Sequence, residues 1–417
     1  MPWPWLVVKS TDTESAPMLS LDDARARLLA RATRLSVERV GVAQSSGRVL
    51  AADLRASEAL PPFDHSAMDG YAVASLDFHG AGPWTFPVSA GGGAGTTAPE
   101  MRPRTAQRIF TGAPLPAGAD SVVKQEDAQR QGEDVLLATR PRLGQHVRHA
   151  GEDLPVGALA LSAGTRMHAG AIALAAMLGR AEVIVTRQPR VTILCSGDEL
   201  RIPGEVARPA SIFESNSAAL GALARQAGAS VRVAPIVRDD RLATEQAVRE
   251  ALEGTDVLLT VGGVSVGDHD VMRPALESAG VTLDFWKVAV KPGKPLAVGH
   301  RDAVHVLGLP GNPASALVAF AFFGAPLLRA LQGDANPAAR PIAARLLDER
   351  KRLSDRVELV RATLRSEAGS MIAEPLENQS SAAATSLAAS DGLAVIPPGS
   401  APLQPGTGVA FVRWVDL

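Results

Sequence analysis

Residues 256–270, DVLLTVGGVSVGDHD, decide how this chain is expected to fold. They begin with a continuous apolar run, 257–261, and not an alternating one, which is typical of a strand covered on both faces in a parallel sheet. The glycines that follow let the backbone turn closely, so that its N–H groups can converge on an anion. Residues 271–280, VMRPALESAG, then place Pro274 where a first helical turn tolerates it. The pattern predicts a strand, a glycine loop and a helix.

Two downstream segments carry related features. Residues 285–295, FWKVAVKPGKP, place lysines around a Pro-Gly turn, and residues 304–320, VHVLGLPGNPASALVAF, predict a second strand, loop and helix. Asn312 is a natural N-cap, and Pro313 fits the first helical position, where its missing N–H costs nothing. Each segment alone also fits a turn, a helix cap or a solvated lysine. Their joint occurrence favours a phosphate or oxyanion site at the carboxyl edge of a parallel sheet.

The composition predicts a globular chain of three or four domains, since 417 residues with 46% hydrophobic residues can form several cores. Lys and Arg number 42 against 44 Asp and Glu, and the charges are mixed along the chain, so neither a nucleic acid nor an anionic membrane is expected as a partner. The single cysteine, Cys195, excludes an intramolecular disulfide and a cysteine-based metal site. A reducing cytoplasm fits this composition.

No membrane-spanning or secretory segment is expected. The longest apolar segment, residues 314–328, is interrupted by Ser315, Gly324 and Pro326 and is shorter than the roughly 18 residues typical of a span, so a core helix is predicted. Residues 1–17 lack a basic start and a long apolar core, and are interpreted as a loosely ordered extension. A cytoplasmic location is therefore expected.

The chain order predicts a multidomain fold, α/β plus β. Ser20 and Asp23 match a capping pattern for a first helix, and strand–helix alternation from Arg190 onward predicts a doubly wound α/β domain. Short β-prone runs broken by Gly and Pro predict an inserted β-rich domain and a small C-terminal β-barrel or sandwich. The expected division is residues 1–17 (extension), 18–59 with 148–186 (discontinuous linking domain of helix and strand), 60–147 (inserted β-rich domain), 187–332 (doubly wound α/β domain) and 333–417 (C-terminal β-barrel-like domain).

Acidic residues follow several predicted strands. Glu199, Asp239 and Asp270 lie at strand ends, where oxygen ligands suit Mg²⁺. Each of them is equally well interpreted as a helix cap. Asp69 and Thr111 lie among small residues that could present them at a surface, but an Asp-Gly turn and a proline-shaped bend explain the same residues.

Several motifs occur in one order from about Met18 to the C-terminus: FDHSAMDGYAV, TGAPLPAGAD, RHAGED, SGDEL, GGVSVGDHD, FWKVAVKPGKP and GLPGNPASA. Together they resemble the molybdopterin molybdenumtransferase family, the MoeA proteins, which are similar to the E domain of gephyrin and to its plant counterpart. The resemblance implies the final step of molybdenum cofactor assembly. Adenylylated molybdopterin and molybdate would react, with Mg²⁺, to give molybdenum-loaded molybdopterin and AMP.

The resemblance also implies site residues and partners. It implies a homodimer with a shared active site, contacts with molybdopterin adenylyltransferase and downstream molybdoenzyme chaperones, and Mg²⁺ held by Glu199 and Asp270. The lysines suit substrates that are all anions. Implied catalytic residues are Asp69, Glu199, Asp239, Asp270, Lys287 and Lys291, and implied substrate-binding residues are Thr111, Asp153, Ser196, Gly262, Gly263, Ser265, Gly267, Lys294, Pro310, Gly311, Asn312 and Pro313.

Three positions depart from the family pattern. His65 stands where the family usually has Asn, His149 replaces an Arg, and Glu214 stands where Asp is common. They put in doubt the anion contacts near Arg148 and the geometry near Asn216. Two alternative functions stay open from the sequence: the preceding adenylylation of molybdopterin, whose enzyme resembles only the α/β domain, and a non-catalytic molybdopterin-binding scaffold.

Overall fold

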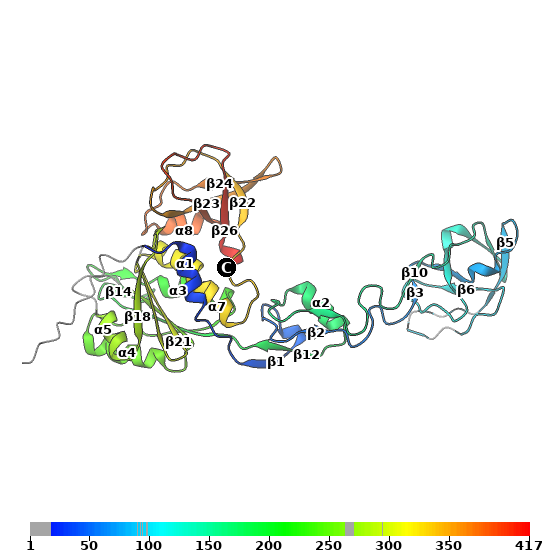
Figure 1. The fold of residues 1–417 in the computed structure, drawn as a ribbon, viewed down its shortest axis with the longest axis horizontal. Coiled ribbons are helices and arrows are strands. Elements are labelled where there is room, and N and C mark those ends of the chain that lie inside the picture. Colours follow the sequence, from blue (N-terminus) through cyan, green and yellow to red (C-terminus); the bar gives the residue numbers. More distant parts are fainter. Residues whose placement is uncertain are drawn as a thin grey trace, which may run out of the picture.

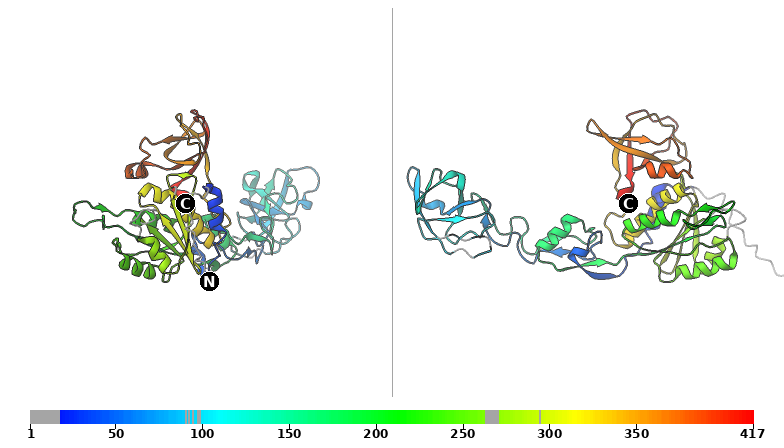
Figure 2. Two further views of the ribbon diagram at one scale, coloured as in Figure 1. Left: turned by 60° about the vertical axis from the view of Figure 1, so that its left-hand side comes forward. Right: turned by 180° about the vertical axis from the view of Figure 1, so that it is seen from behind.

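The computed structural model describes residues 18–417 except for residues 90, 92, 94, 97, 98, 263–270 and 294, and gives the backbone alone for residues 285–287 and 295. The molecule is elongated (Figure 1), with an α/β unit and the C-terminal strands at one end and a β-rich unit at the other. Paired strands and helix α2 connect the two ends, as two further views also show (Figure 2). The expected multidomain α/β plus β fold is confirmed.

The α/β unit contains a six-stranded sheet in the order β16-β13-β17-β21-β20-β18. The first four strands are parallel, and every residue of β17 is buried, as expected from the apolar run. Strand β20 runs antiparallel to both of its neighbours, β21 and β18. The connections between these strands are too short for the crossover that parallel neighbours need. The strands are β13 (Arg190–Cys195), β16 (Ser230–Val233), β17 (Val257–Val261), β18 (Thr282–Lys287), β20 (Pro295–Arg301) and β21 (Val304–Leu309).

The order of these strands creates a switch point. From β13 the chain passes through α3 to β16 on one side, and then through α4 to β17 on the other side of β13. The crossovers diverge at the carboxyl ends of β13 and β17, which is where doubly wound sheets bind ligands. The helices are α3 (Asn216–Gln226), α4 (Arg241–Leu252), α5 (Met272–Ser278), α6 (Pro313–Ala319) and α7 (Ala325–Leu331).

The apolar segment after β21 is a core element. It forms α6, a short π-helical stretch (Phe320–Gly324) and α7, and the stretch Pro313–Leu331 is the one part of the described chain that is long and apolar enough to cross a membrane. The protein interior buries 83% of its most apolar window, which agrees with the expected core helix. Helix α1 (Leu21–Leu29) starts at the N-cap Ser20, whose side chain accepts from Asp23 N, and packs against α7.

The middle of the molecule joins two distant parts of the sequence. Strand β1 (Val37–Gly41) pairs with β12 (Glu182–Thr186), and β2 (Leu54–Arg55) pairs with β11 (Leu159–Leu161). Helix α2 (Ala169–Met177) packs Ala171 and Ala175 into the same small core as side chains of β12. The chain between these strands extends away from them to the β-rich unit (Figure 1).

The β-rich unit contains a six-stranded sheet in the order β7-β4-β6-β5-β9-β8. Phe78 and Phe86 stack in its core, with ring centroids 4.9 Å apart. Two short strands, β3 (His65–Ser66) and β10 (Val147–Arg148), pair where the chain enters and leaves the unit. The sheet strands are β4 (Gly70–Val73), β5 (Trp84–Ser89), β6 (Ala106–Ile109), β7 (Ser121–Lys124), β8 (Ala128–Gln131) and β9 (Asp134–Leu137).

The C-terminal strands close into a barrel, because β23 pairs with β25 as well as with β24. The expected barrel-like domain is confirmed, although β22 and helix α8 (Ala384–Ala389) were not predicted. A further strand, β19 (Val290–Lys291), joins the barrel to the α/β unit by pairing with β23. The barrel strands are β22 (Ile342–Leu346), β23 (Val357–Glu367), β24 (Ser370–Pro375), β25 (Gly392–Ile396) and β26 (Gly408–Arg413).

Asp256 stabilises the amino end of the central sheet. Its buried carboxylate accepts from both terminal nitrogens of Arg187 at 2.7 Å and from the backbone N–H of Arg190 at 2.7 Å. Burial by itself would raise the pKa of Asp256, but the Arg187 and Arg190 hydrogen bonds outweigh it and lower the pKa to about 2. The ionised carboxylate therefore holds the start of β13 against the start of β17.

We predict that Asp256→Asn makes the protein less stable at neutral pH by about 2 kcal/mol. The folded pKa lies below the unfolded value of about 3.9, so the contribution is complete above that value and is lost as the pH falls towards 2. Urea unfolding of both proteins between about pH 7 and pH 3 measures it. The matched control is Asp284→Asn, because Asp284 forms only an exposed pair with Arg31 at 4.0 Å. An equal loss at both positions would contradict the prediction.

Candidate active site

A cavity of about 510 Å³ lies at the switch point of the sheet. Its walls are the ends of β13 and β17, the turn before α6, the start of α3, the short strands β14 (Leu200–Arg201) and β15 (Ile212–Phe213), and one residue of the C-terminal unit, Ala382. Six residues predicted for the site line it: Ser196, Glu199, Gly262, Gly311, Asn312 and Pro313. Residues of three motifs, SGDEL, GGVSVGDHD and GLPGNPASA, thus meet at one place.

Gly262 gives this cavity a wall made of backbone. Its φ is +86°, and a Cβ atom there would lie 2.9 Å from the carbonyl oxygen of Ser196. A larger residue would therefore be strained and would push β13 and β17 apart. At Gly311 a Cβ atom would point at the Cα of Gly262, 3.8 Å away. That distance is an ordinary contact, so the close approach that requires glycine is the one at Gly262, between the ends of β17 and β13.

Two buried polar atoms line the cavity without a protein partner. The Ser196 hydroxyl belongs to a residue that is 6% exposed, and the Oδ1 atom of Asn216 to one that is 9% exposed, and neither forms a hydrogen bond among the described residues. The Asn216 amide is oriented, because its Nδ2 donates to the Gly311 carbonyl at 2.8 Å. Buried polar atoms without partners are costly, so these two are suited to bind a polar ligand.

Glu214 and Cys195 form the inner wall. The Glu214 carboxylate accepts from the backbone N–H and the hydroxyl of Ser217, and so caps α3 in place of Ser215, which makes no side-chain cap. The Cys195 thiol donates to Glu214 at 3.5 Å. Burial, followed by the nearby Glu214 charge, raises the pKa of Cys195, so the residue is a thiol and not a nucleophilic thiolate. The departure at Glu214 thus still leaves Asn216 facing the cavity.

The predicted carboxylates that the structure describes do not gather into one cluster. Glu199 is exposed at the cavity rim, where Gly197 leaves room for it, since a Cβ atom there would lie 2.6 Å from Glu199 Oε2. Asp239 is exposed outside the lining, and its neighbour Asp240 caps α4 by accepting from Ala243 N at 2.8 Å. Within the described parts of the chain no group of three His, Cys, Asp or Glu could hold a metal. Glu199, Ser196 and Asn216 nevertheless provide oxygen atoms, which fit Mg²⁺ when substrate and water supply the rest.

Lys291 lies beside the cavity and not in its lining. Its ammonium is 3.3 Å from the carboxylate of Glu358, which is also 3.2 Å from Arg350. The turn after it brings Gly293 close to Ser315 in α6. Pro310 precedes the lining residue Gly311 but is not part of the lining. Other predicted residues lie outside the described residues: Gly263, Ser265, Gly267, Asp270 and Lys294. For Lys287 the structure describes the backbone alone.

Asp69 and Thr111 contact each other in the β-rich unit. The Thr111 backbone N–H and hydroxyl donate to the same Asp69 oxygen at 2.8 and 2.7 Å. The Thr111 backbone hydrogen bond, then the side-chain one, lowers the pKa of Asp69, so the carboxylate is ionised. The sheet that contains β6 lies at the opposite end of the molecule from β21 (Figure 1). One chain therefore does not bring Asp69, Thr111 or the exposed Asp153 to the cavity.

The residues that the sequence missed come from segments without a glycine or acidic motif. The sequence ESN (214–216) at the start of α3 could have indicated Asn216, because a helix start after a strand lies at the carboxyl edge of the sheet. Ala382 carries no such signal, because it reaches the cavity only through docking of the C-terminal unit. Further lining residues not predicted for the site are Cys195, Leu200, Ile212, Phe213, Glu214, Ser215, Asn216, Val261 and Ala382.

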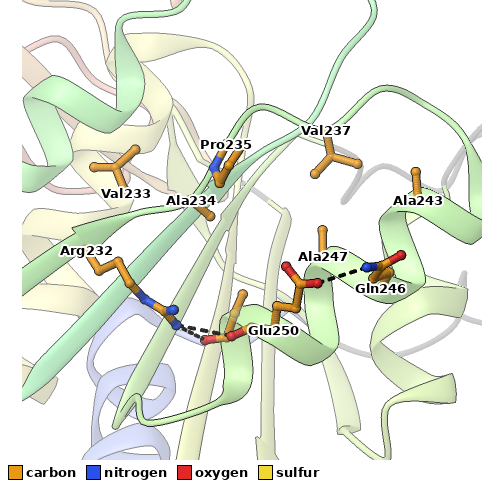
Figure 3. A pocket seen from close by; sticks show the side chains of 10 residues that line it. Arg232, Val233, Ala234, Pro235, Val237, Ala243, Gln246, Ala247 and Glu250 are labelled. Carbon is orange, nitrogen blue, oxygen red and sulfur yellow. Dashed lines mark hydrogen bonds between the residues drawn. The ribbon is translucent and has the colours of Figure 1, made fainter.

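A second cavity, of about 290 Å³, lies between β16 and α4 (Figure 3). Arg232 reaches across it and donates to the carbonyls of Glu250 and Ala251, each at 3.2 Å, and Gln246 donates to Glu250 at 3.0 Å. The Arg232 bonds cap the carbonyl end of α4. Because its polar side chains are already paired with each other or with backbone, this cavity is interpreted as a structural groove.

The fold and the cavity define an α/β protein with a cavity suited to a polar small molecule at its switch point and with two additional β units. Residues 19–179 match the family model for the MoeA N-terminal region (domain I and II), residues 192–330 that for a probable molybdopterin binding domain, and residues 343–414 that for the MoeA C-terminal region (domain IV). The matches cover the three parts of the chain in order.

Whole proteins give the same result. The molybdopterin molybdenumtransferase of Bacillus subtilis strain 168 is 33% identical over 404 residues, which cover 95% of this chain and 94% of that protein. Molybdopterin molybdenumtransferase 2 of Mycobacterium tuberculosis H37Rv is 40% identical over 309 residues, 72% of this chain and 76% of that protein. The crystal structure of the molybdopterin biosynthesis MoeA protein from Pyrococcus horikoshii OT3 superposes with a TM-score of 0.82 at 27% identity, covering 95% and 100% of the two chains. This chain belongs to the molybdopterin molybdenumtransferase family, and the expected resemblance is confirmed.

Proposed function

We propose that this chain inserts molybdenum into molybdopterin, the activity that the names of its relatives state for them. The observation that carries the proposal is the cavity at the switch point, where Ser196 Oγ and Asn216 Oδ1 are buried without a partner among the described residues. A pterin carries several N–H and carbonyl groups along its edge, and these can satisfy both atoms. The soft sulfur ligands of the metal belong to the substrate, so the single buried thiol of Cys195 is sufficient for this chemistry.

The proposed reaction uses adenylylated molybdopterin and molybdate and releases AMP. Molybdate and the phosphate groups of the substrate are anions. They suit the cations Lys287, Lys291 and Lys294 and the backbone N–H groups near Gly262. Glu199 and Asp270 would hold Mg²⁺, which polarises the phosphoanhydride when bound. Around it, the chain's own residues orient the substrate: Asn216 is fixed by Gly311, and Glu214 fixes the start of α3.

We further propose that two copies of the chain share each active site. The position of Asp69 and Thr111, far from the cavity of their own chain, supports this proposal. We keep the division into the domains expected from the sequence, which the pairing of β1 with β12 supports. We also propose that the protein is cytoplasmic. It would contact the adenylyltransferase that supplies its substrate and the molybdoenzyme chaperones that receive its product.

The test is to incubate the purified protein with adenylylated molybdopterin, Mg²⁺ and molybdate and to follow AMP release. Release that depends on molybdate is expected. If the substrate binds but no molybdate-dependent AMP forms, the chain is a molybdopterin-binding scaffold. The preceding reaction, adenylylation of molybdopterin with ATP, is assayed separately as the control for the adenylyltransferase alternative. The matches to residues 19–179 and 343–414, outside the α/β unit, disfavour that alternative.

We predict that Glu358→Gln and Lys291→Ala change the molybdate requirement in opposite directions. Lys291 is half exposed and already paired with the buried Glu358, so an oxyanion has to compete with that carboxylate for the ammonium. Removing the Glu358 charge should lower the KM for molybdate about three- to tenfold, and removing Lys291 should raise it by a similar factor. Steady-state AMP release at varied molybdate measures both. If Glu358→Gln also raises the KM, the carboxylate positions Lys291 instead of competing for it.

A further inference from the structure

A third cavity lies where the α/β unit meets the C-terminal barrel. It has a volume of about 510 Å³ and lies between the end of α7, the connection to β22 and the short helix η5 (Trp414–Asp416). We call it the junction pocket. None of its lining residues lines the candidate active site. The charged residues of its lining are Arg329, Arg340, Arg413, Asp334 and Asp416.

Both carboxylates of the junction pocket are already neutralised. Asp416 accepts from Arg413 in a bidentate pair at 2.7 and 2.8 Å. Asp334 pairs with Arg166 at 3.1 Å and also accepts from the backbone N–H of Asn336 at 2.9 Å. Each acid therefore has its own arginine. The two other arginines of the lining, Arg329 and Arg340, are in excess over the acids of the pocket.

Arg329 is a buried cation with incomplete hydrogen bonding. One terminal nitrogen donates to the carbonyl of Asp416 at 3.0 Å, and its Nε is buried without a partner among the described residues. Burial, and then the neighbouring Arg166, lowers the pKa of Arg329, which agrees with a guanidinium that lacks enough negative charge around it. With Arg166 included, the pocket has four arginines and two carboxylates, an excess of two positive charges. If the α-carboxylate of Leu417 is also counted, an excess of one positive charge remains.

Arg340 extends this excess to the mouth of the pocket. Its side chain is exposed, and no ion pair joins it to a described acidic residue. A simpler explanation exists for Arg329 alone: a cation in the last turn of α7 offsets the negative end of the helix dipole. That explanation does not account for Arg340 or for a cavity between them. Two guanidinium groups that face one cavity are suited to a group that accepts several hydrogen bonds, such as a phosphate.

We propose that the junction pocket binds a phosphoryl group, either free phosphate or the terminal phosphate of a small molecule. An anion held by Arg329 of the α/β unit and Arg340 of the connection would hold the C-terminal barrel at a defined angle to α7. The Asp334–Arg166 pair extends this network to the segment before α2. The pocket would therefore couple the orientation of three parts of the chain to an anion. This inference does not depend on the proposed function.

The test titrates the full-length protein with inorganic phosphate, and separately with AMP, by isothermal calorimetry at low salt. We expect binding with a Kd below about 1 mM, weakened at least tenfold by Arg340→Gln and by Arg329→Gln. The control is Arg39→Gln, an exposed arginine of β1 whose side chain forms no hydrogen bond or ion pair among the described residues. Arg340 is exposed, so its replacement should leave the far-ultraviolet circular dichroism unchanged. If phosphate and AMP bind with equal affinity, the pocket recognises the phosphoryl group alone. If AMP binds more tightly than phosphate and Arg340→Gln removes the difference, the ligand is a small phosphorylated molecule.

The active-site cavity is a competing location for phosphate. Ser196→Ala separates the two, because Ser196 lines that cavity and is absent from the junction pocket. The proposal is overturned if wild-type protein does not bind either ligand, if Arg340→Gln and Arg329→Gln bind like wild type, or if only Ser196→Ala weakens binding. Because none of these outcomes requires turnover, failure of the junction pocket and failure of the proposed function are distinguishable.

Discussion

Ser196→Ala is expected to weaken substrate binding by about 10- to 100-fold while leaving the folded protein as stable as the wild type or slightly more stable. In the free protein the Ser196 hydroxyl is buried at the cavity wall without a hydrogen-bond partner among the described residues, so its removal costs no bond. In the complex the same change would leave a buried polar group of the ligand without a partner. The two measurements are substrate affinity by calorimetry and the free energy of unfolding in urea.

Thr260 offers a matched control for this experiment. Its hydroxyl is also buried without a partner among the described residues, but Thr260 is not part of the cavity lining. Thr260→Val should therefore match Ser196→Ala in stability and match the wild type in affinity. If Thr260→Val weakens binding as much as Ser196→Ala, the effect comes from the sheet and not from a contact with the ligand. If Ser196→Ala loses stability, its hydroxyl is satisfied by a bound water and has a structural role.

The sequence predicted best where local chemistry and fold agree. The largely apolar, non-alternating run of β17 and the Asn-Pro start of α6 each depend on neighbouring residues alone, and both lie where expected. A strand near Val281 was expected and is β18, but β20 and its antiparallel pairing were not predicted, because only the shortness of the connections decides that direction. Asn312 occupies the N-cap position but makes no side-chain cap, so the motif predicted the place and not the bond.

The site could be predicted only in part for a similar reason. Ser196, Glu199 and Gly262 follow strands of one sheet, so a motif at the end of each strand leads to the same edge. Ala382 belongs to a unit that is docked on this edge, and docking cannot be read from periodicity. The pairing of Lys291 with Glu358 also depends on contact between two units, β19 against β23. A carboxylate that competes for a predicted anion-binding lysine was therefore unexpected.

The separation of Asp69 from the cavity leads to the prediction with the largest effect. Asp69 is held by Thr111 at one end of the molecule, and Glu199 lies at the rim of the cavity at the other end (Figure 1). If both act in catalysis, the acid of one chain has to serve the cavity of another. A closed two-fold dimer is the simplest arrangement that gives each cavity such a partner, because the same contact then occurs twice.

Asp69→Ala and Glu199→Ala are each expected to abolish turnover, and a mixture of the two inactive proteins, dissociated and reassembled together, should recover up to about a quarter of wild-type activity. Random reassembly gives about half mixed dimers, and in each of these one of the two sites combines an unchanged Asp69 with an unchanged Glu199. Exchange is checked by native mass spectrometry with one isotopically labelled protein. The control mixes two proteins that both carry Glu199→Ala, in which no intact site can form. Confirmed exchange without recovered activity would mean that Asp69 serves its own chain or only holds the turn before β4, because a shared site has to be restored by mixing.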